Sequence, residues 1–238
     1  MIHHPRTHDE SHAGALSSKL NWLRASVLGA NDGIISMAAL LTGVAGAAAG
    51  AHTLVITGVA GLLAGACSMA IGEYVSVSSQ RDTERVLLAK ERHELEHDAD
   101  YELQELTHIY EQKGLQPETA RTVAEELTAH DAFAAHVDAE LGIDPDQLTN
   151  PWHAGFASAV SYTLGGLIPF LAIVLAPLAS RIPVTYLAVF AALVLTGLMS
   201  ARASGGSRFG TVMRVALGGV IAMSITYAIG TLFSVSGI

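Results

Sequence analysis

Five runs of this 238-residue chain are long and apolar enough to cross a lipid bilayer, which takes about 20 helical residues. They cover residues 25–48, 53–76, 154–178, 182–200 and 210–234. A water-soluble helix keeps one polar face, so a soluble core does not produce five such runs in one short chain. The pattern predicts an all-α membrane protein with five transmembrane helices.

An acidic segment separates the second run from the third. Residues 81–150 hold 18 of the 22 Asp and Glu residues but six of the 13 Lys and Arg residues, which leaves this segment at −12 and the rest at +3. Such an excess excludes nucleic acid as a partner, because phosphates need Lys and Arg, and it suits cations. We call residues 81–150 the acidic insert.

The distribution of basic residues sets the expected orientation, because cytoplasmic loops carry the excess of Lys and Arg. With a cytoplasmic N-terminus, one side carries the six bases of the insert, and outside it Arg6, Lys19, Arg24, Arg202, Arg208 and Arg214. The other side carries Arg181 alone. We expect a flexible cytoplasmic tail (1–22), transmembrane helices 1 and 2 (23–80), a small cytoplasmic helical metal-binding lobe (81–150) and transmembrane helices 3 to 5 (151–238).

No helix breaker separates the second apolar run from the start of the insert, "EYVSVSSQRDTERVLLAKERHE". This predicts one long helix that leaves the membrane and breaks near Asp98. A second helix should run to Gln112 and end at Gly114, and a third should start at Pro117, since proline suits the first helical position. The last helix of the insert should end at Leu141.

The insert contains HELEH, which fits the zinc-protease pattern H-E-x-x-H through His93 and His97. It also contains Glu94-x-x-His97 and Glu105-x-x-His108, the pairs of carboxylate di-iron bundles. A protease needs a third ligand and a substrate cleft, for which a small helical lobe has little room. A di-iron site needs its two pairs on separate helices of a four-helix bundle, and pairs that start only eleven residues apart are too close for this. We therefore expect no enzyme.

A row of carboxylates in the same segment favours ion capture instead. At 100° per residue the row falls within an arc of about 80° on a continuous helix, and His93 and His97 point roughly 120° away from it. A break near Asp98 would give two facing helices, each with an E-x-x-E pair. The alternative is an acidic face that is merely solvated. The row consists of Glu91, Glu94, Asp98, Glu102 and Glu105.

Polar residues also lie inside the apolar runs. Asp32 is about eight residues into the first run, where an acid costs roughly 2.5–3.5 kcal/mol to insert. It is either an ion or proton site or a packing hydrogen bond, with Asn31, to a neighbouring helix. Met69 and Glu73 are four residues apart on the second run, and a thioether beside a carboxylate suits a borderline-soft divalent metal. By itself, Met69 would be a core methionine.

Four stretches together resemble the vacuolar iron transporter family: "LRASVLGANDGIISMAALLTGVAGA", "SMAIGEYVSVSSQRD", the two E-x-x-E pairs and "SYTLGGLIPF". The resemblance covers nearly everything from Leu23 onward. It implies five spans, a cytoplasmic metal-binding lobe between the second and third, and a homodimer with the ion path at its interface. It also implies exchange of Fe²⁺ or Mn²⁺ for protons, with no prosthetic group, by a bacterial-type member in the cell (inner) membrane.

Carried over by position, the resemblance places Asp32 and Met69 in the membrane ion site. The lobe carboxylates are Glu91, Glu94, Glu102, Glu105 and Glu140. The family pattern has methionines in the last lobe helix, where this chain has His136 and Val137, so the lobe site offers more nitrogen and oxygen and less sulfur, which favours Zn²⁺ or Mn²⁺. With Glu73, these are the candidate metal ligands of a proton-coupled antiporter that moves metal out of the cytoplasm. The alternative is a membrane-anchored metal buffer or sensor, which has no use for an acid such as Asp32 in the bilayer.

Overall fold

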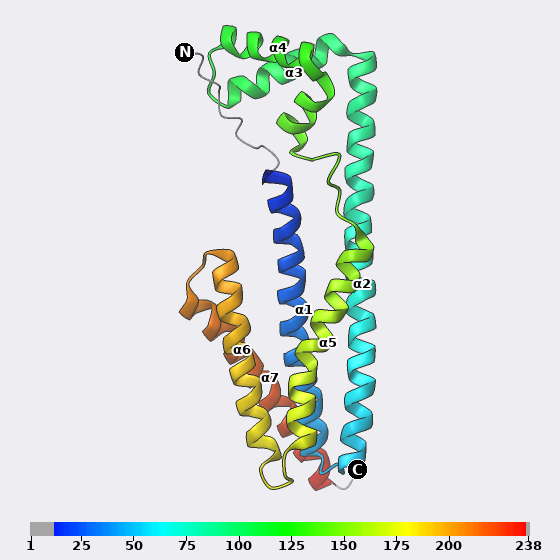
Figure 1. Ribbon diagram of the computed structural model, residues 1–238, viewed down its shortest axis with the longest axis vertical. Coiled ribbons are helices and arrows are strands. Elements are labelled where there is room, and N and C mark those ends of the chain that lie inside the picture. The colour runs from blue at the N-terminus through cyan, green and yellow to red at the C-terminus, as the bar shows by residue number, and fades with distance from the viewer. Residues whose placement is uncertain (1–11, 237–238) are drawn as a thin grey trace, which may run out of the picture. The chain divides into compact units, whose positions relative to one another are not determined.

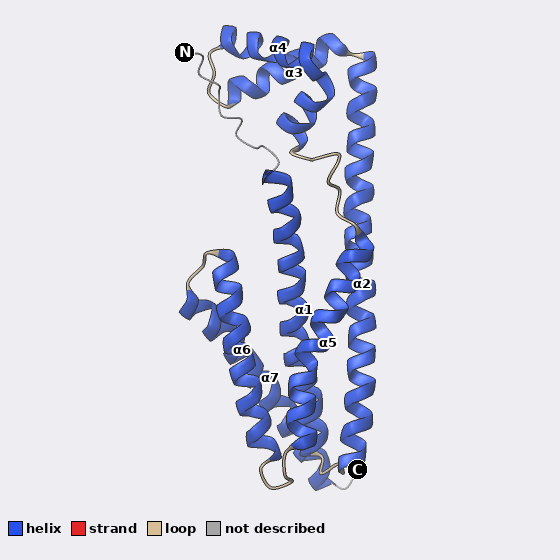
Figure 2. Ribbon diagram, viewed as in Figure 1, coloured by secondary structure: helices blue, strands red, loops and turns tan. Residues whose placement is uncertain are grey.

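The computed structural model describes residues 12–236, and these form helices joined by loops (Figures 1 and 2). The chain divides into two compact units. One consists of residues 16–75 and 151–238, and we call it the membrane unit. The other contains residues 76–150 and so includes the acidic insert.

Five helices of the described chain are long and apolar enough to span a membrane, which confirms the predicted all-α membrane protein. The spans are Ala25–Gly46, Ala51–His97, Pro151–Leu175, Arg181–Arg202 and Arg208–Ser234. They lie in helices α1 (His12–Gly46), α2 (Ala51–His97), α5 (Pro151–Leu175), α6 (Arg181–Ser204) and α7 (Arg208–Ser236). The protein is therefore an integral membrane protein.

Helix α2 continues without interruption from the second apolar run into the acidic insert, as the sequence predicts. Its 47 residues rise about 70 Å at 1.5 Å per residue, more than twice the roughly 30 Å of bilayer hydrocarbon. The apolar part lies in its first half, and the charged second half starts the acidic insert. A bilayer around the apolar half therefore leaves the charged half outside the hydrocarbon.

Helix α1 supplies residues to both buried clusters of the membrane unit. One cluster joins α1 to α6 and α7 through Ile34, Ala38, Val189, Ala192, Leu193 and Met223. The other joins α1 to α2 and α5 through Met37, Leu41, Leu54, Leu62, Tyr162 and Ile173. Packing on both sides of α1 fixes the rotation of this helix, and so fixes which side chains of its Asn31-Asp32-Gly33 turn face other helices.

Glycines allow the backbones of α1 and α5 to touch, as small residues do in membrane helix pairs. A Cβ atom on Gly33 would collide with the carbonyl of Tyr162, and one on Gly165 would collide with the carbonyl of Ala30. The spaces beside Gly61 and Gly65 are filled from the same chain, by Met37 and Leu40 and by the ring of Tyr162 respectively. The G-x-x-x-G pair of α2 is therefore used for packing within one copy.

The close α1–α5 contact gives a stability prediction. Gly33→Ala should lower the thermal unfolding midpoint of the detergent-solubilised protein, because overpacking against a backbone carbonyl costs about 1–3 kcal/mol. The matched control is Gly218→Ala in α7, where an added Cβ meets nothing within 4 Å. That control should be neutral or slightly stabilising, since alanine is the better helix former. Equal midpoints for the two variants would contradict the close contact.

The insert continues from α2 into α3 (Ala99–Gln112), α4 (Pro117–His136) and a short π-helical turn, Val137–Leu141. The break between α2 and α3 lies at Asp98, and α4 starts with proline, both where the sequence predicts them. Gly114 and Gly142 have φ of 101° and 60°, values that favour glycine, and each follows a helix end. Leu106 of α3 and Ala120 and Ala124 of α4 are fully buried and form the apolar interior of this unit.

Candidate metal site

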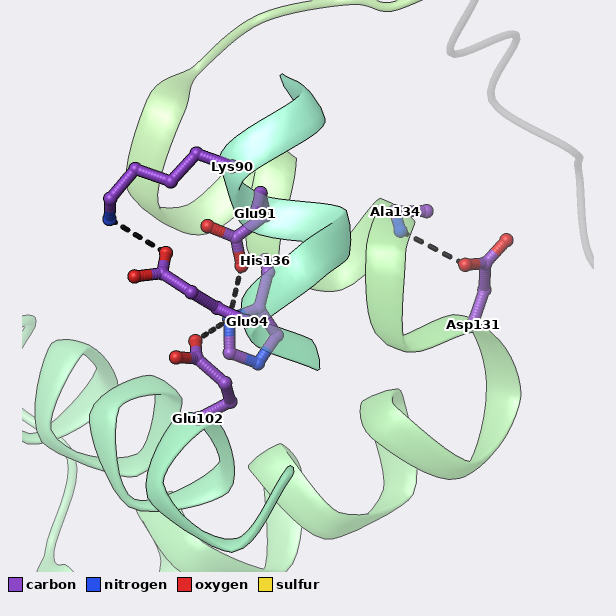
Figure 3. Close-up of polar contacts among 7 residues, drawn as sticks. All are labelled: Lys90, Glu91, Glu94, Glu102, Asp131, Ala134 and His136. Carbon is purple, nitrogen blue, oxygen red and sulfur yellow. Dashed lines mark hydrogen bonds and ion pairs between the residues drawn. The ribbon is translucent and has the colours of Figure 1, made fainter. Parts of the chain in front are cut away.

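Three side chains from three helices meet inside the acidic insert. They are Glu91 from α2, Glu102 from α3 and His136 from the last turn of α4 (Figure 3). One ligand atom from each lies within 4.8 Å of the other two, and the three residues are 2%, 3% and 0% exposed. In the described part of the chain, this is the one group of three or more His, Cys, Asp or Glu residues close enough for a single ion. We call it the triad.

The break at Asp98 turns the chain from α2 into α3, so that Glu91 and Glu102 approach from two different helices. Helix α4 is itself interrupted at Asp131, which has φ −159° and ψ 95°. The Ala134 N–H donates to Asp131 Oδ1 at 2.9 Å, as in an N-cap, and the helix restarts from there (Figure 3). This restarted turn carries His136.

A cation–π contact joins the restarted turn of α4 to α2. The Arg92 guanidinium carbon lies 4.4 Å from the ring centroid of Phe133. Phe133 precedes His136 by three residues, and Arg92 follows Glu91 directly. The contact therefore holds the segment that carries the imidazole against the segment that carries the carboxylate.

The distances within the triad fit ligands of one cation. His136 Nδ1 lies 3.1 Å from Glu91 Oε1 and 3.5 Å from Glu102 Oε2. Ligands bound at about 2.1 Å lie about 3.0 Å apart in an octahedron and about 3.4 Å apart in a tetrahedron. Both His136 ring nitrogens and Glu91 Oε1 are buried and have no hydrogen-bond partner among the described residues. Buried polar atoms normally have partners, so His136 Nδ1 and Glu91 Oε1 point to a ligand that these two atoms share, while Nε2 lies on the other side of the ring.

The pKa of each triad side chain is shifted in the direction that favours its neutral form. Burial, the charges of Glu140 and Glu102, and a hydrogen bond with Glu140 raise the pKa of Glu91 to about 7. Burial, with the charge of Glu105 next, raises the pKa of Glu102. Burial lowers the pKa of His136, and the charge of Glu140 opposes this only in part. A divalent cation among these groups would lower the pKa of the two carboxyl groups, because it favours their charged forms.

The other predicted insert ligands surround the triad without joining it. Glu140 is exposed, and its charge contributes to the raised pKa of Glu91. Glu94 accepts a 2.6 Å hydrogen bond from Lys90, and its charge still acts on Glu91 and Glu102 (Figure 3). Glu105 is half-buried on α3 and acts on Glu102. These three carboxylates raise the negative potential around the triad.

The structure does not assemble the zinc-protease or di-iron motifs that the sequence contains. His93 and His97 are exposed on α2. Glu94 pairs with Lys90 rather than with His97. On α3, the Nδ1 of His108 lies 3.5 Å from Glu111.

Among the described residues, Asp32 and Glu73 of the membrane unit belong to no group of three or more His, Cys, Asp or Glu residues close enough for a single ion. Asp32 is exposed on α1, and Glu73 is half-buried on α2. Met69 packs against the buried cluster of α1, α2 and α5, which is the position of a core methionine.

A packing hydrogen bond from this turn to a neighbouring helix is present, and Asn31 makes it rather than Asp32. Its Oδ1 accepts a 2.6 Å hydrogen bond from the Thr196 hydroxyl of α6. One residue beyond Asp32, Gly33 packs against α5, so Asp32 points to a different side from both neighbours. Among the described residues, the side-chain hydrogen bond from this turn to a neighbouring helix is thus made by Asn31.

Tyr162 is the one important residue near this turn that sequence reasoning missed. Its hydroxyl lies 2.9 Å from the Ser36 hydroxyl, which in turn donates to the backbone oxygen of Asp32 at 2.6 Å. The "SYTLGG" stretch shows a tyrosine in an apolar run but not the helix that it faces.

Comparisons with known proteins agree with this architecture. A model of the VIT family matches residues 23–231. The chain is 39% identical to a vacuolar iron transporter of Acanthamoeba castellanii, over 96% of this chain and 85% of that protein. It is 37% identical to vacuolar iron transporter homolog 5 of Oryza sativa subsp. japonica, over 94% and 86%, and 32% identical to VIT-like transporter 1b of Glycine max, over 92% and 80%. The chain therefore belongs to the VIT family.

Proposed function

We propose that the protein is a proton-coupled antiporter that moves Fe²⁺ or Mn²⁺ out of the cytoplasm, and that the triad of the acidic insert captures the ion. One relative that shares most of this chain is named a vacuolar iron transporter, and another is named vacuolar iron transporter homolog 5. We place the protein in a bacterial inner membrane, with the N-terminus and acidic insert in the cytoplasm, because Lys and Arg concentrate on that side.

The buried triad is the observation that carries this proposal. Two carboxylates held away from water raise the free energy of the ion-free protein unless a proton or a cation neutralises them. An imidazole with two carboxylates is a nitrogen and oxygen donor set that accepts Fe²⁺, Mn²⁺ and Zn²⁺. The geometry therefore supports capture of a divalent transition ion as cargo, with no prosthetic group.

Asp32 supports transport in addition to binding. An exposed carboxylate in an apolar span is costly in lipid and marks ion or proton paths when it faces a cavity or a partner. A second copy of the chain that covers this face would remove the carboxylate from lipid, so we propose a homodimer with its ion path beside Asp32. Glu73 and Met69 are the further candidates for this path, with Met69 the weaker because it packs in the core.

A flux experiment tests the proposal. Full-length protein in liposomes should release or accumulate Fe²⁺ and Mn²⁺ in response to a pH gradient, with Zn²⁺ as the third ion tested. Metal movement should carry protons the opposite way. The alternative, a membrane-anchored buffer or sensor, predicts metal binding at the triad with no flux in either gradient.

Capture at the triad should weaken as pH falls through about 7. Glu91 has to lose its proton to bind an ion, and its pKa is about 7, so affinity for Mn²⁺ should fall about tenfold per pH unit below that value. His136 should not set the midpoint, because its lowered pKa keeps it neutral there. Calorimetry on full-length protein between pH 8 and 5.5 measures this, with Glu126→Gln, an exposed carboxylate of α4, as the control that keeps the midpoint. A midpoint near 5 would contradict the role of Glu91.

A further inference from the structure

The two histidines of HELEH lie together on the outside of the insert. His93 and His97 are one helical turn apart on α2, and their ring centroids are 4.0 Å apart with 43° between the ring planes. Both residues are exposed, so an ion and its water ligands can reach them. Neither ring takes part in the triad or in an ion pair with a described residue.

A hydrogen bond orients the His97 ring in the same way as the rings of many metal-binding histidines. His97 Nδ1 lies 2.8 Å from the His93 backbone oxygen. A carbonyl oxygen only accepts, so Nδ1 carries the proton and Nε2 keeps its lone pair free. Histidine ligands of metals usually donate their second nitrogen in this way, which fixes both the tautomer and the ring.

We propose that His93 and His97 form a second metal site, a two-nitrogen chelate for borderline divalent ions such as Zn²⁺, Ni²⁺ and Cu²⁺. Histidines at i and i+4 share a helix face and can bind one ion together, as the first two ligands of H-E-x-x-H do. Water fills the remaining positions, because no described third residue meets the pair. Mn²⁺ and Fe²⁺ should prefer the oxygen-rich triad, since imidazole affinity rises along the series toward Cu²⁺.

The site is separate from the triad in residues and chemistry. Glu91 and Glu102 lie buried, whereas the histidine pair is on the surface of the same helical unit. The histidine site does not depend on transport. A negative flux experiment would leave it standing, and a negative Ni²⁺ titration would leave the antiporter proposal standing.

Titration of untagged full-length protein in detergent with Ni²⁺ tests the pair. His93→Gln, His97→Gln and the double variant should each lose the same single Ni²⁺ equivalent, because removing either nitrogen weakens a chelate on the order of tenfold or more. His108→Gln and His130→Gln are the matched controls, since both are exposed histidines elsewhere in the insert, and they should retain that equivalent. Mn²⁺ binding and helicity should stay unchanged in all five proteins, which shows that they fold.

Three results would overturn the proposal. The first is retention of the Ni²⁺ equivalent in the double variant. The second is loss of a half equivalent in each single variant, which would indicate independent histidines. The third is equal loss in the His108→Gln or His130→Gln control.

Discussion

Asp32→Asn should abolish metal flux and metal-driven proton movement in proteoliposomes while metal binding at the triad persists. Asparagine keeps the size and hydrogen bonding of aspartate, but it cannot release a proton or balance the charge of a cation. Asp32 belongs to α1 of the membrane unit, whereas the triad belongs to the insert. We therefore expect a loss of transport of at least a hundredfold, with an Mn²⁺ affinity in calorimetry that stays within twofold.

Two further variants separate charge from packing at this turn. Asp32→Glu keeps the charge in a displaced position and should retain part of the flux. Asn31→Ala removes the hydrogen bond to Thr196 and should lower the thermal midpoint while proton coupling persists. Wild-type flux with intact proton coupling in Asp32→Asn would rule out the proposed ion path.

The helices could be predicted because their signals are local. Five apolar runs of sufficient length require five spans, and breakers near Asp98, Gly114 and Pro117 divide the insert where the structure divides it. The substitution of His136 for the expected methionine was visible in the sequence as a change of donor atom. Its burial beside two carboxylates also agrees with the sequence-based choice of ligands.

The sequence does not show which of the carboxylates join His136 in the triad. Glu91 and Glu94 are one helical turn apart and share a face, yet only Glu91 is covered by the restarted turn of α4. That turn depends on the local cap at Asp131, which interrupts an otherwise continuous helical pattern, and on the Arg92–Phe133 contact, which is a tertiary feature. Met69 shows the same limit, since the sequence gives its spacing from Glu73 but does not show that its half-buried side chain packs against the cluster of α1, α2 and α5.

Glu91→Gln should remove ion capture at the triad and yet stabilise the metal-free protein. In the folded protein the pKa of Glu91 is about 7, above its ordinary value of 4.5. The folded state therefore holds this proton longer than the unfolded state, and the free energy of unfolding falls as pH rises from about 4.5 to 7. At pH 8 the buried charge costs on the order of 3 kcal/mol, which a neutral glutamine avoids.

Measurement at pH 8 isolates this effect from His136. The pKa of His136 is lowered, so the imidazole destabilises the folded state only as pH falls below its ordinary value of 6.5. At pH 8 it is neutral in both states and contributes nothing. Glu94→Gln is the control, because Glu94 is partly exposed and pairs with Lys90, and it should change the midpoint little.

Metal should then reverse the order of the two proteins. An ion that binds only the folded state raises stability by about 4.1 kcal/mol at a thousandfold excess over its dissociation constant, which exceeds the gain from the glutamine substitution. Thermal unfolding in a chelator should place Glu91→Gln above wild type, and unfolding in saturating Mn²⁺ should place wild type above Glu91→Gln. If Mn²⁺ raises both midpoints equally, the ion binds elsewhere and the triad is not the capture site. If wild type and Glu91→Gln unfold at the same midpoint in chelator, the Glu91 carboxylate does not destabilise the metal-free protein, and the proposed effect of its burial is wrong.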